Sequence, residues 1–204
     1  VRLGWSCGDQ EKFTRDELIE KFSLKAVGKS AGVFNLEKMQ ELNAWYIRQS
    51  SDELLAKEVS PFLNQLGFEE LDTKKVMAAA DTLKERSKTL VEMAEKAGFY
   101  FQEEISYEKK ADDKFLMPGV LELLEDLQKR LEQISDFNLT ELERTFIAFL
   151  EDNGVKLKVV AQPLRVALTG RTVSPGIFEM MEVLGKNEVM KRLKKALIHI
   201  KGKA

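Results

Sequence analysis

Several residue types that enzymes and secreted proteins rely on are scarce in this sequence of 204 residues. Its one cysteine, Cys7, excludes a disulfide within the chain and is typical of a reducing compartment. Its one histidine, His199, stands near the other end of the chain. Catalysis by a Cys–His pair and a metal site of His and Cys ligands are therefore not expected. We expect His199 to be an interfacial residue on a terminal helix.

Long apolar runs and nucleotide-binding motifs are also missing. No run approaches the ~20 apolar residues that a membrane span requires, and no signal peptide is recognisable. Neither G-x-G-x-x-G nor G-x-x-x-x-G-K-[ST] occurs. The carboxylate pairs Glu103-Glu104 and Asp112-Asp113 are interpreted as solvated faces. The sequence predicts a cytoplasmic protein whose chain holds no catalytic residue, no metal site and no cofactor. Because it begins at Val1 inside an apolar phrase, we expect a piece of a longer protein.

Acidic and basic residues nearly balance, at 34 and 32, but they are unevenly distributed. Residues 154–204 hold eleven Lys and Arg against three Asp and Glu, a net charge of +8, whereas the preceding residues carry −10. A basic final quarter is typical of a surface that faces phosphates, because steering depends on the local field rather than on the total charge. The alternative is an ordinary solvated surface of lysines on terminal helices.

Helix signals recur along the whole chain, and alternating strand patterns are nearly absent. The one doubtful segment is 154–160, GVKLKVV. Proline at position 61 is expected to interrupt a helix, because it lacks the amide N–H and clashes with the preceding turn. Capping and stop residues predict helix starts at Thr14, Asn35, Ser50, Asp72, Pro118 and Thr140, and helix ends at Gly98, Gly154 and Gly170.

These signals predict an all-α fold, a helical bundle or cage. Polar residues 48–52 and the aromatic run 99–101 mark changes in composition. They divide the chain into units 1–50, 51–98 and 99–204.

Candidate RNA-binding residues gather in and around the segment 162–193. Arg165 stands in an apolar helical run, and an arginine in such a run usually has a partner. An RNA ligand and a structural salt bridge explain this arginine equally well. Ser174 and Pro175 offer a helix cap followed by proline at the first helical position, and such a helix start can bind base or phosphate oxygens. Ile177 could cover a base. The cluster 84–88, KERSK, is either a second cationic site or a solvated turn.

Several phrases resemble glutamyl-tRNA synthetases and follow one another in that family's order. The segment 3–13, LGWSCGDQEKF, resembles the part after the family's KMSKS loop, and 33–48, VFNLEKMQELNAWYIR, its stem-contact helix. The segment 85–101, ERSKTLVEMAEKAGFYF, resembles the first anticodon-binding subdomain. AQPLRVALTG and SPGIFEMMEVLGK, within 161–186, resemble the second and are the most specific. The likeness covers essentially the whole chain.

The resemblance implies a partial stem-contact domain over 1–50, followed by anticodon-binding subdomains over 51–98 and 99–204. The partner implied is glutamate tRNA, with no DNA and no membrane. The parent enzyme is expected to be a monomer, either bacterial or, as the alternative, organellar. In the family, an arginine at the position of Arg86 is associated with reading the first anticodon base. The resemblance implies that such an arginine occurs in enzymes that charge glutamate tRNA alone. Ser174 replaces the threonine of some members and keeps the hydroxyl. Anticodon contacts are carried over to Arg86, Arg165, Ser174, Pro175 and Ile177, and phosphate contacts are expected at Lys191, Arg192, Lys194 and Lys195.

The family's ATP site uses a HIGH-type motif and a KMSKS-type lysine loop, and neither occurs in this sequence. We therefore expect ATP and Mg²⁺ to be bound by another part of the parent ligase and this chain to be inactive alone. A rival hypothesis from another class is a helical protein-interaction module whose basic face meets an acidic partner. Binding that ignores the anticodon sequence would favour that module.

Overall fold

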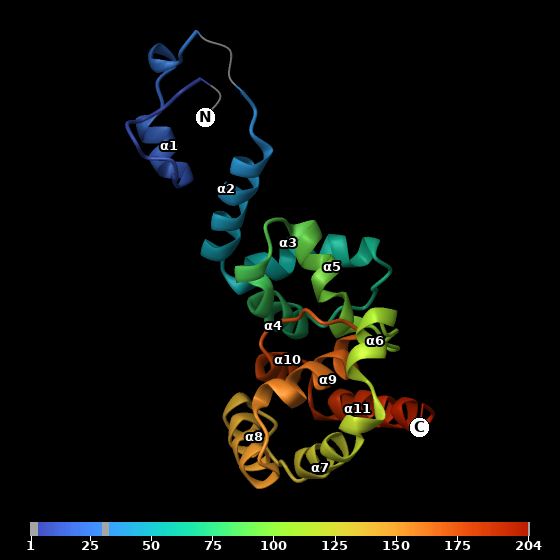
Figure 1. The fold of residues 1–204 in the computed structure, drawn as a ribbon. Coiled ribbons are helices and arrows are strands. Elements are labelled where there is room, and N and C mark those ends of the chain that lie inside the picture. The colour runs from blue at the N-terminus through green and yellow to red at the C-terminus, as the bar shows by residue number, and fades with distance from the viewer. Residues whose placement is uncertain (1–3, 30–32, 204) are drawn as a thin grey trace.

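The computed structural model describes residues 4–29 and 33–203, and the regular elements named within them are all helices, which confirms the predicted all-α fold (Figure 1). Three short 3-10 turns, η1 (Leu24–Ala26), η2 (Lys84–Arg86) and η3 (Pro118–Val120), accompany the α-helices. The α-helices are α1 (Arg15–Lys21), α2 (Leu36–Gln49), α3 (Asp52–Gln65), α4 (Thr73–Leu83), α5 (Leu90–Phe101), α6 (Lys109–Phe115), α7 (Leu121–Glu132), α8 (Leu139–Asn153), α9 (Leu157–Thr169), α10 (Ile177–Leu184) and α11 (Lys186–Lys201).

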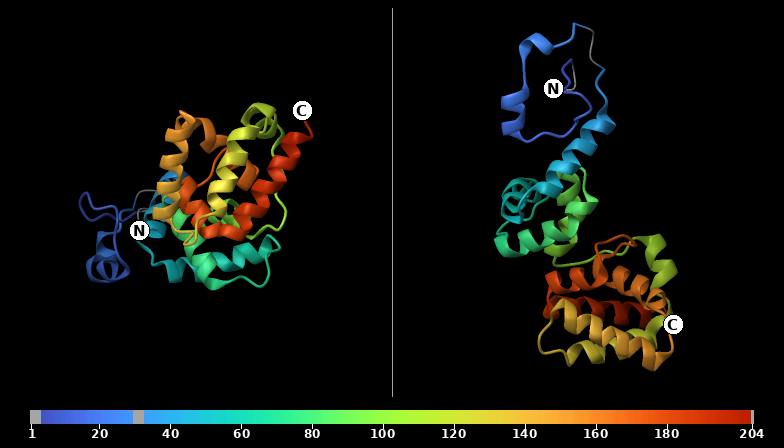
Figure 2. Two further views of the ribbon diagram at one scale, coloured as in Figure 1. Left: turned by 90° about the horizontal axis from the view of Figure 1, so that it is seen from below. Right: turned by 90° about the vertical axis from the view of Figure 1, so that its left-hand side faces the viewer.

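The helices form three groups along an elongated molecule, as Figure 1 and the right-hand view of Figure 2 show. Helices α1 and α2 lie at one end, α3 to α5 in the middle, and α6 to α11 at the other end. In the middle group α3 packs against both α4 and α5, and in the last group α11 packs against α7 and α9. None of the helices in the described part of the chain is long and apolar enough to cross a membrane.

The first group has a small aromatic core. Trp5 and Phe13 are buried, and the Trp5 ring centroid lies 5.7 Å from that of Phe13 and 5.6 Å from that of Phe22. The Tyr46 hydroxyl of α2 donates to the Phe13 carbonyl, which ties this core to the helix. Helix α1 buries none of its residues, so the first group contributes little to the main core.

Several predicted helix ends are confirmed. Thr14 opens α1 with a reciprocal capping box to Glu17, and the side chains of Asn35 and Asp72 cap α2 and α4. At Gly154 and Gly170 the backbone φ angles are +61° and +77°, the left-handed conformation in which glycine commonly ends a helix. Pro118 begins η3, which leads directly into α7.

Other predicted boundaries are wrong. The caps of α3 and α8 are Ser51 and Asn138, where Ser50 and Thr140 were expected. Pro61 lies inside α3 without ending it, because the buried residues on either side pack into the core and outweigh the lost backbone hydrogen bond. Segment 154–160 contains no strand, since α9 begins at Leu157.

The predicted boundary between residues 98 and 99 falls inside α5. Gly98 does not end this helix, because Ala97, Phe99 and Tyr100 around it are buried. A Cβ at Gly98 would lie 3.5 Å from the Phe68 ring, which is an ordinary van der Waals contact. The connection between the second and third groups therefore follows Phe101 and runs over residues 102–108.

Candidate nucleic-acid interface

Arg86 ends the 3-10 turn η2, at the junction between α4 and α5. Helix α5 holds this turn through Lys96, whose ammonium group donates to the Arg86 carbonyl, and through Glu92, whose carboxylate accepts from the Lys88 N–H at 2.7 Å. Helix α2 holds it from the other side, because Asn43 Nδ2 donates to the Lys88 carbonyl at 2.7 Å. The backbone of the turn is thus fixed while the Arg86 side chain is exposed.

Arg165 projects from α9 toward the loop that follows this helix. Its Nε donates to Ser174 Oγ at 2.7 Å, and that hydroxyl donates to the Pro175 carbonyl at 2.9 Å. Ser174 was predicted to cap a helix, and this prediction is wrong. Helix α10 begins at Ile177, and Gly176 occupies its cap position. The hydroxyl instead fixes the guanidinium of Arg165 against the loop.

Helix packing brings the Arg86 turn and the Arg165–Ser174 pair together. Helix α10, which directly follows the loop 170–176, packs against α4, which directly precedes η2. The right-hand view of Figure 2 shows this loop on the side of the last group that faces the middle group. Burial, and then the positive charge of Arg86, lower the pKa of the Arg165 guanidinium. The second cause agrees with the packing of α10 against α4, which places both cations at this junction.

Within residues 4–29 and 33–203, no ion pair forms at Arg86 or Arg165, whereas five other arginines pair with carboxylates: Arg48, Arg130, Arg144, Arg171 and Arg192. Two close cations without an acid make a local positive field that favours a bound anion. The structural salt bridge that was the alternative reading of Arg165 is therefore not found among the described residues.

The sequence analysis missed two polar side chains beside these arginines. Ser87 Oγ and Gln162 Oε1 are the buried side-chain atoms of the described residues that have no hydrogen-bond partner. Ser87 follows Arg86, and Gln162 lies three residues before Arg165, which places it on the same side of α9. The helical spacing of Gln162 and Arg165 was a usable signal, whereas no sequence signal marks Ser87.

The other residues predicted to contact anticodon bases are less accessible. Pro175 is buried, and the Ile177 side chain is 6% exposed and packs in the core. A base can therefore reach Ile177 only through its backbone at the start of α10. Ser174 is half-buried and remains at the surface of the loop.

The four basic residues predicted to contact phosphates lie on α11 and differ in their surroundings. The prediction is wrong for Arg192, which is 3% exposed and bonded to the protein interior. Lys191 donates to the Glu103 carbonyl at 3.3 Å, and Lys195 pairs with the Glu104 carboxylate. Lys194 is exposed and stays a candidate. The basic tail helix thus directs much of its charge to the protein itself.

Among the described residues there is no group of three or more His, Cys, Asp and Glu side chains that could hold a metal ion. The polar groups that converge here are guanidinium, hydroxyl and amide groups, which recognise bases and phosphates through hydrogen bonds.

A protein-family model described as anticodon binding domain matches residues 54–197, which is most of this chain. The chain belongs to the anticodon-binding domain family. The match runs through the middle and last helical groups and includes Arg86, Arg165 and Ser174.

Relatives of this anticodon-binding domain are glutamate–tRNA ligases. The ligase of Geobacter sulfurreducens is 46% identical over 98% of this chain, and that of Syntrophobacter fumaroxidans is 50% identical over 97%. The crystal structure of a glutamate tRNA ligase from Elizabethkingia meningosepticum superposes with a TM-score of 0.86, at 28% identity over 97% of this chain. The chain spans 43%, 42% and 39% of the lengths of these three proteins.

Proposed function

We propose that this chain reads the anticodon of glutamate tRNA as part of a glutamate–tRNA ligase. One arrangement carries the proposal: Arg165, fixed by Ser174, and Arg86 lie at the junction of α10 with α4, and neither forms an ion pair with any of the described residues. The family match and the likeness to glutamate–tRNA ligases support it. Such a pair of cations binds an anionic partner, and an RNA loop supplies phosphates and base acceptors together.

The N–H groups of the Arg165 guanidinium have two different roles. Its Nε is taken by Ser174 Oγ, so the plane of the group is fixed, and the N–H groups of Nη1 and Nη2 are left to donate to a ligand. A guanidinium whose position is set before binding loses little side-chain entropy when it meets a base edge. Repulsion from Arg86 is relieved when an anion binds, which adds to the affinity.

Arg86 would supply the choice between two tRNAs. Glutamate and glutamine codons differ only in their first letter, which pairs with the third anticodon base. We therefore propose that Arg86 reads the third anticodon base, in place of the first base that the resemblance assigns to it. That base is cytosine in glutamate tRNA and guanine in glutamine tRNA. Cytosine presents two acceptors on its pairing edge, whereas guanine presents mainly donors, and a guanidinium can only donate.

The chemistry of the ligase would take place outside this chain. We propose that glutamate activation with ATP and Mg²⁺ occurs elsewhere in the parent protein, since this sequence contains no HIGH-type or KMSKS-type motif. In that arrangement the present chain positions the anticodon arm and supplies specificity. Lys194 and the other exposed lysines of α11 would add phosphate attraction that weakens with salt.

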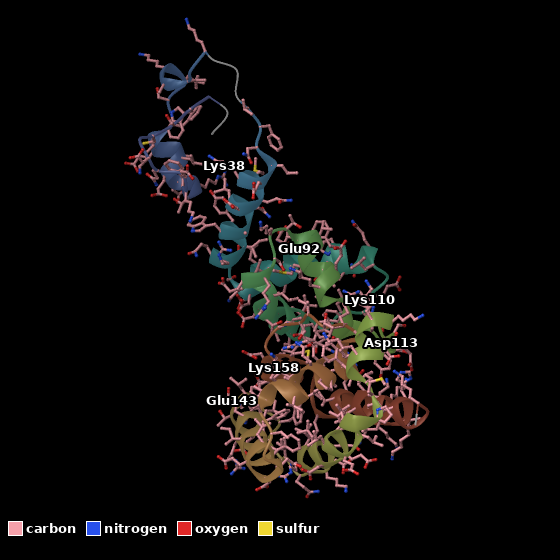
Figure 3. All side chains as sticks on the ribbon, in the orientation of Figure 1. Lys38, Glu92, Lys110, Asp113, Glu143 and Lys158 are labelled. Atoms are coloured by element: carbon pink, nitrogen blue, oxygen red, sulfur yellow. The ribbon has the colours of Figure 1, made fainter. Side chains whose placement is uncertain are left out.

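The test is binding of this chain to transcribed glutamate tRNA with its native anticodon or a scrambled one, at two salt concentrations. We expect tighter binding of the native anticodon and a further loss with Arg165→Ala of about five- to a hundredfold, confined to the native anticodon. Lys158→Ala is the matched control, because Lys158 is an exposed cation at the opposite end of the same helix (Figure 3).

Two results would contradict the proposal. Equal binding of both tRNAs that disappears at high salt would indicate a general basic surface. Equal losses for Arg165→Ala and Lys158→Ala would show that Arg165 contributes charge and no base recognition. Either result would favour the rival hypothesis of a docking module with a basic partner-binding face.

A further inference from the structure

Arg192 is a buried cation that binds three backbone carbonyls from two other parts of the fold. Its Nη1 donates to the carbonyls of Phe99 at 2.9 Å and Leu168 at 2.8 Å, and its Nη2 donates to that of Gln102 at 2.9 Å. Its Nε donates to Glu188 Oε1 one turn away on α11 at 2.6 Å. With 3% of its surface exposed, the guanidinium has no room for an external ligand.

The three carbonyls belong to the C-terminal ends of two helices. Phe99 lies in the last turn of α5 and Gln102 caps that helix, while Leu168 lies in the last turn of α9. Carbonyls in these positions lack partners within their own helix and carry the negative end of the helix dipole. A buried guanidinium satisfies them and joins the two helix ends, one from the middle group and one from the last group.

The end of α9 is also the base of the RNA-facing loop. Arg165 stands one turn before Leu168, and the loop with Ser174 begins at Gly170. The Gly170 carbonyl accepts from the Glu108 N–H at 2.9 Å, and a Cβ at Gly170 would lie 2.1 Å from the Ser106 carbonyl oxygen. The loop therefore starts from a clamp made by Arg192 on one side and the connection 102–108 on the other.

We propose that Arg192 is a positioning residue for anticodon reading, which holds the ends of α5 and α9 together and thereby sets Arg165 and Ser174 relative to Arg86. The inference rests on the proposed function. The guanidinium shape is essential, because its planar fork reaches three carbonyls and one carboxylate, whereas a lysine ammonium is a single point of charge. A displacement of about 1 Å at a recognition site can cost up to a hundredfold.

The experiment compares the wild-type chain with Arg192→Lys, which keeps the charge and loses the fork. Affinity is measured for glutamate tRNA with the native and the scrambled anticodon, and circular dichroism records the helix content. We expect the preference for the native anticodon to fall about tenfold or more, while binding of the scrambled tRNA is unchanged. Lys158→Met is the control, because it removes an exposed cation from α9, one of the two helices that Arg192 joins, and should leave the preference unchanged.

A milder variant covers the case in which Arg192→Lys does not fold. Glu188→Gln keeps the shape of the side chain that orients the Arg192 Nε and removes its charge. We expect a loss of anticodon preference that is smaller than the loss for Arg192→Lys.

The outcomes separate the two proposals. A wild-type chain without anticodon preference would overturn the proposed function and this inference with it. A wild-type chain that prefers the native anticodon, with folded variants at positions 192 and 188 that keep the full preference, would overturn the positioning role alone. An equal loss of affinity for both tRNAs in folded variants would show that Arg192 serves the fold in general, and would likewise overturn the positioning role.

Discussion

Helix α11 and the junction of Arg86 with Arg165 both concentrate basic side chains, and they use this charge differently. On α11, Arg192 binds buried carbonyls, Lys195 pairs with Glu104, and Lys201 pairs with Glu125 at 2.7 Å. At the junction, Arg86 and Arg165 have no carboxylate partner in the described residues, and each repels the other. A high local count of lysine and arginine therefore does not identify the binding surface by itself.

The reason for the difference lies in which groups each helix packs against. Helix α11 lies beside the carbonyl end of α5, an acidic side chain of α7, and residues 103–104. Its cations therefore find partners within the protein. The junction is formed where α10 meets α4, and the nearby unpaired polar atoms, Ser87 Oγ and Gln162 Oε1, are uncharged. Cations that the protein leaves unpaired are the ones available to an RNA ligand.

The largest expected effect is on stability, at the centre of α11. Arg192→Met leaves three buried carbonyls without their donors and leaves Glu188 with only its longer ion pair to Lys191 at 3.8 Å, so the free energy of unfolding should fall by about 3–5 kcal/mol. Urea unfolding followed by circular dichroism measures this value. The matched change Lys194→Met should stay within about 0.5 kcal/mol of the wild type. Similar unfolding free energies for Arg192→Met and Lys194→Met would show that the buried hydrogen bonds of Arg192 do not stabilise the fold. Helix α11 would then no longer differ from the junction.

A substitution at the junction should leave stability almost unchanged and reduce anticodon selectivity. Arg86→Gln removes an exposed cation that forms no ion pair with the described residues, so stability should change by no more than about 0.5 kcal/mol. The preference for cytosine over guanine as the third anticodon base should decrease by about 1–3 kcal/mol. Binding or charging assays with tRNAs that differ at this base give the preference. Unchanged selectivity would show that Arg86 does not read the anticodon.

The smallest effect concerns pH and the far end of α11. Asp112 accepts from His199 Nε2 at 2.8 Å and from Lys203 Nζ at 2.5 Å. Burial acts to raise the pKa of Asp112, but these hydrogen bonds outweigh it and hold the pKa below its ordinary value of 3.8. This contribution to stability is present above the unfolded-state pKa and is lost as the pH falls through the lower folded-state pKa.

Asp112→Asn should therefore lower the free energy of unfolding by about 1 kcal/mol near neutral pH, and the difference from wild type should disappear in strong acid. Unfolding curves at several pH values test this. Asp113→Asn is the control, because Asp113 is the exposed neighbour on the same helix (Figure 3). A difference that persists unchanged into acid would mean that shape, rather than charge, links α6 to α11.

The sequence predicted the helices better than their ends. The caps at Thr14, Asn35 and Asp72 are local side-chain-to-backbone contacts, so they are readable from a few residues. Pro61 and Gly98 were read as breaks, but both lie inside helices. Local propensity is worth a few kcal/mol at most, and burial of the flanking apolar residues exceeds it. The His199 prediction fits its position beside Asp112 and Tyr107.

The sequence by itself determined the all-α class and the presence of an arginine, a glycine turn and a serine in one short segment, because periodicity and turn chemistry depend on neighbouring residues. Tertiary structure decided which cations are free. Arg192 and Lys194 are two positions apart, and only one of them meets carbonyls contributed by residues 99, 102 and 168. Pairing of a charge depends on groups far away in the chain, which packing brings to it.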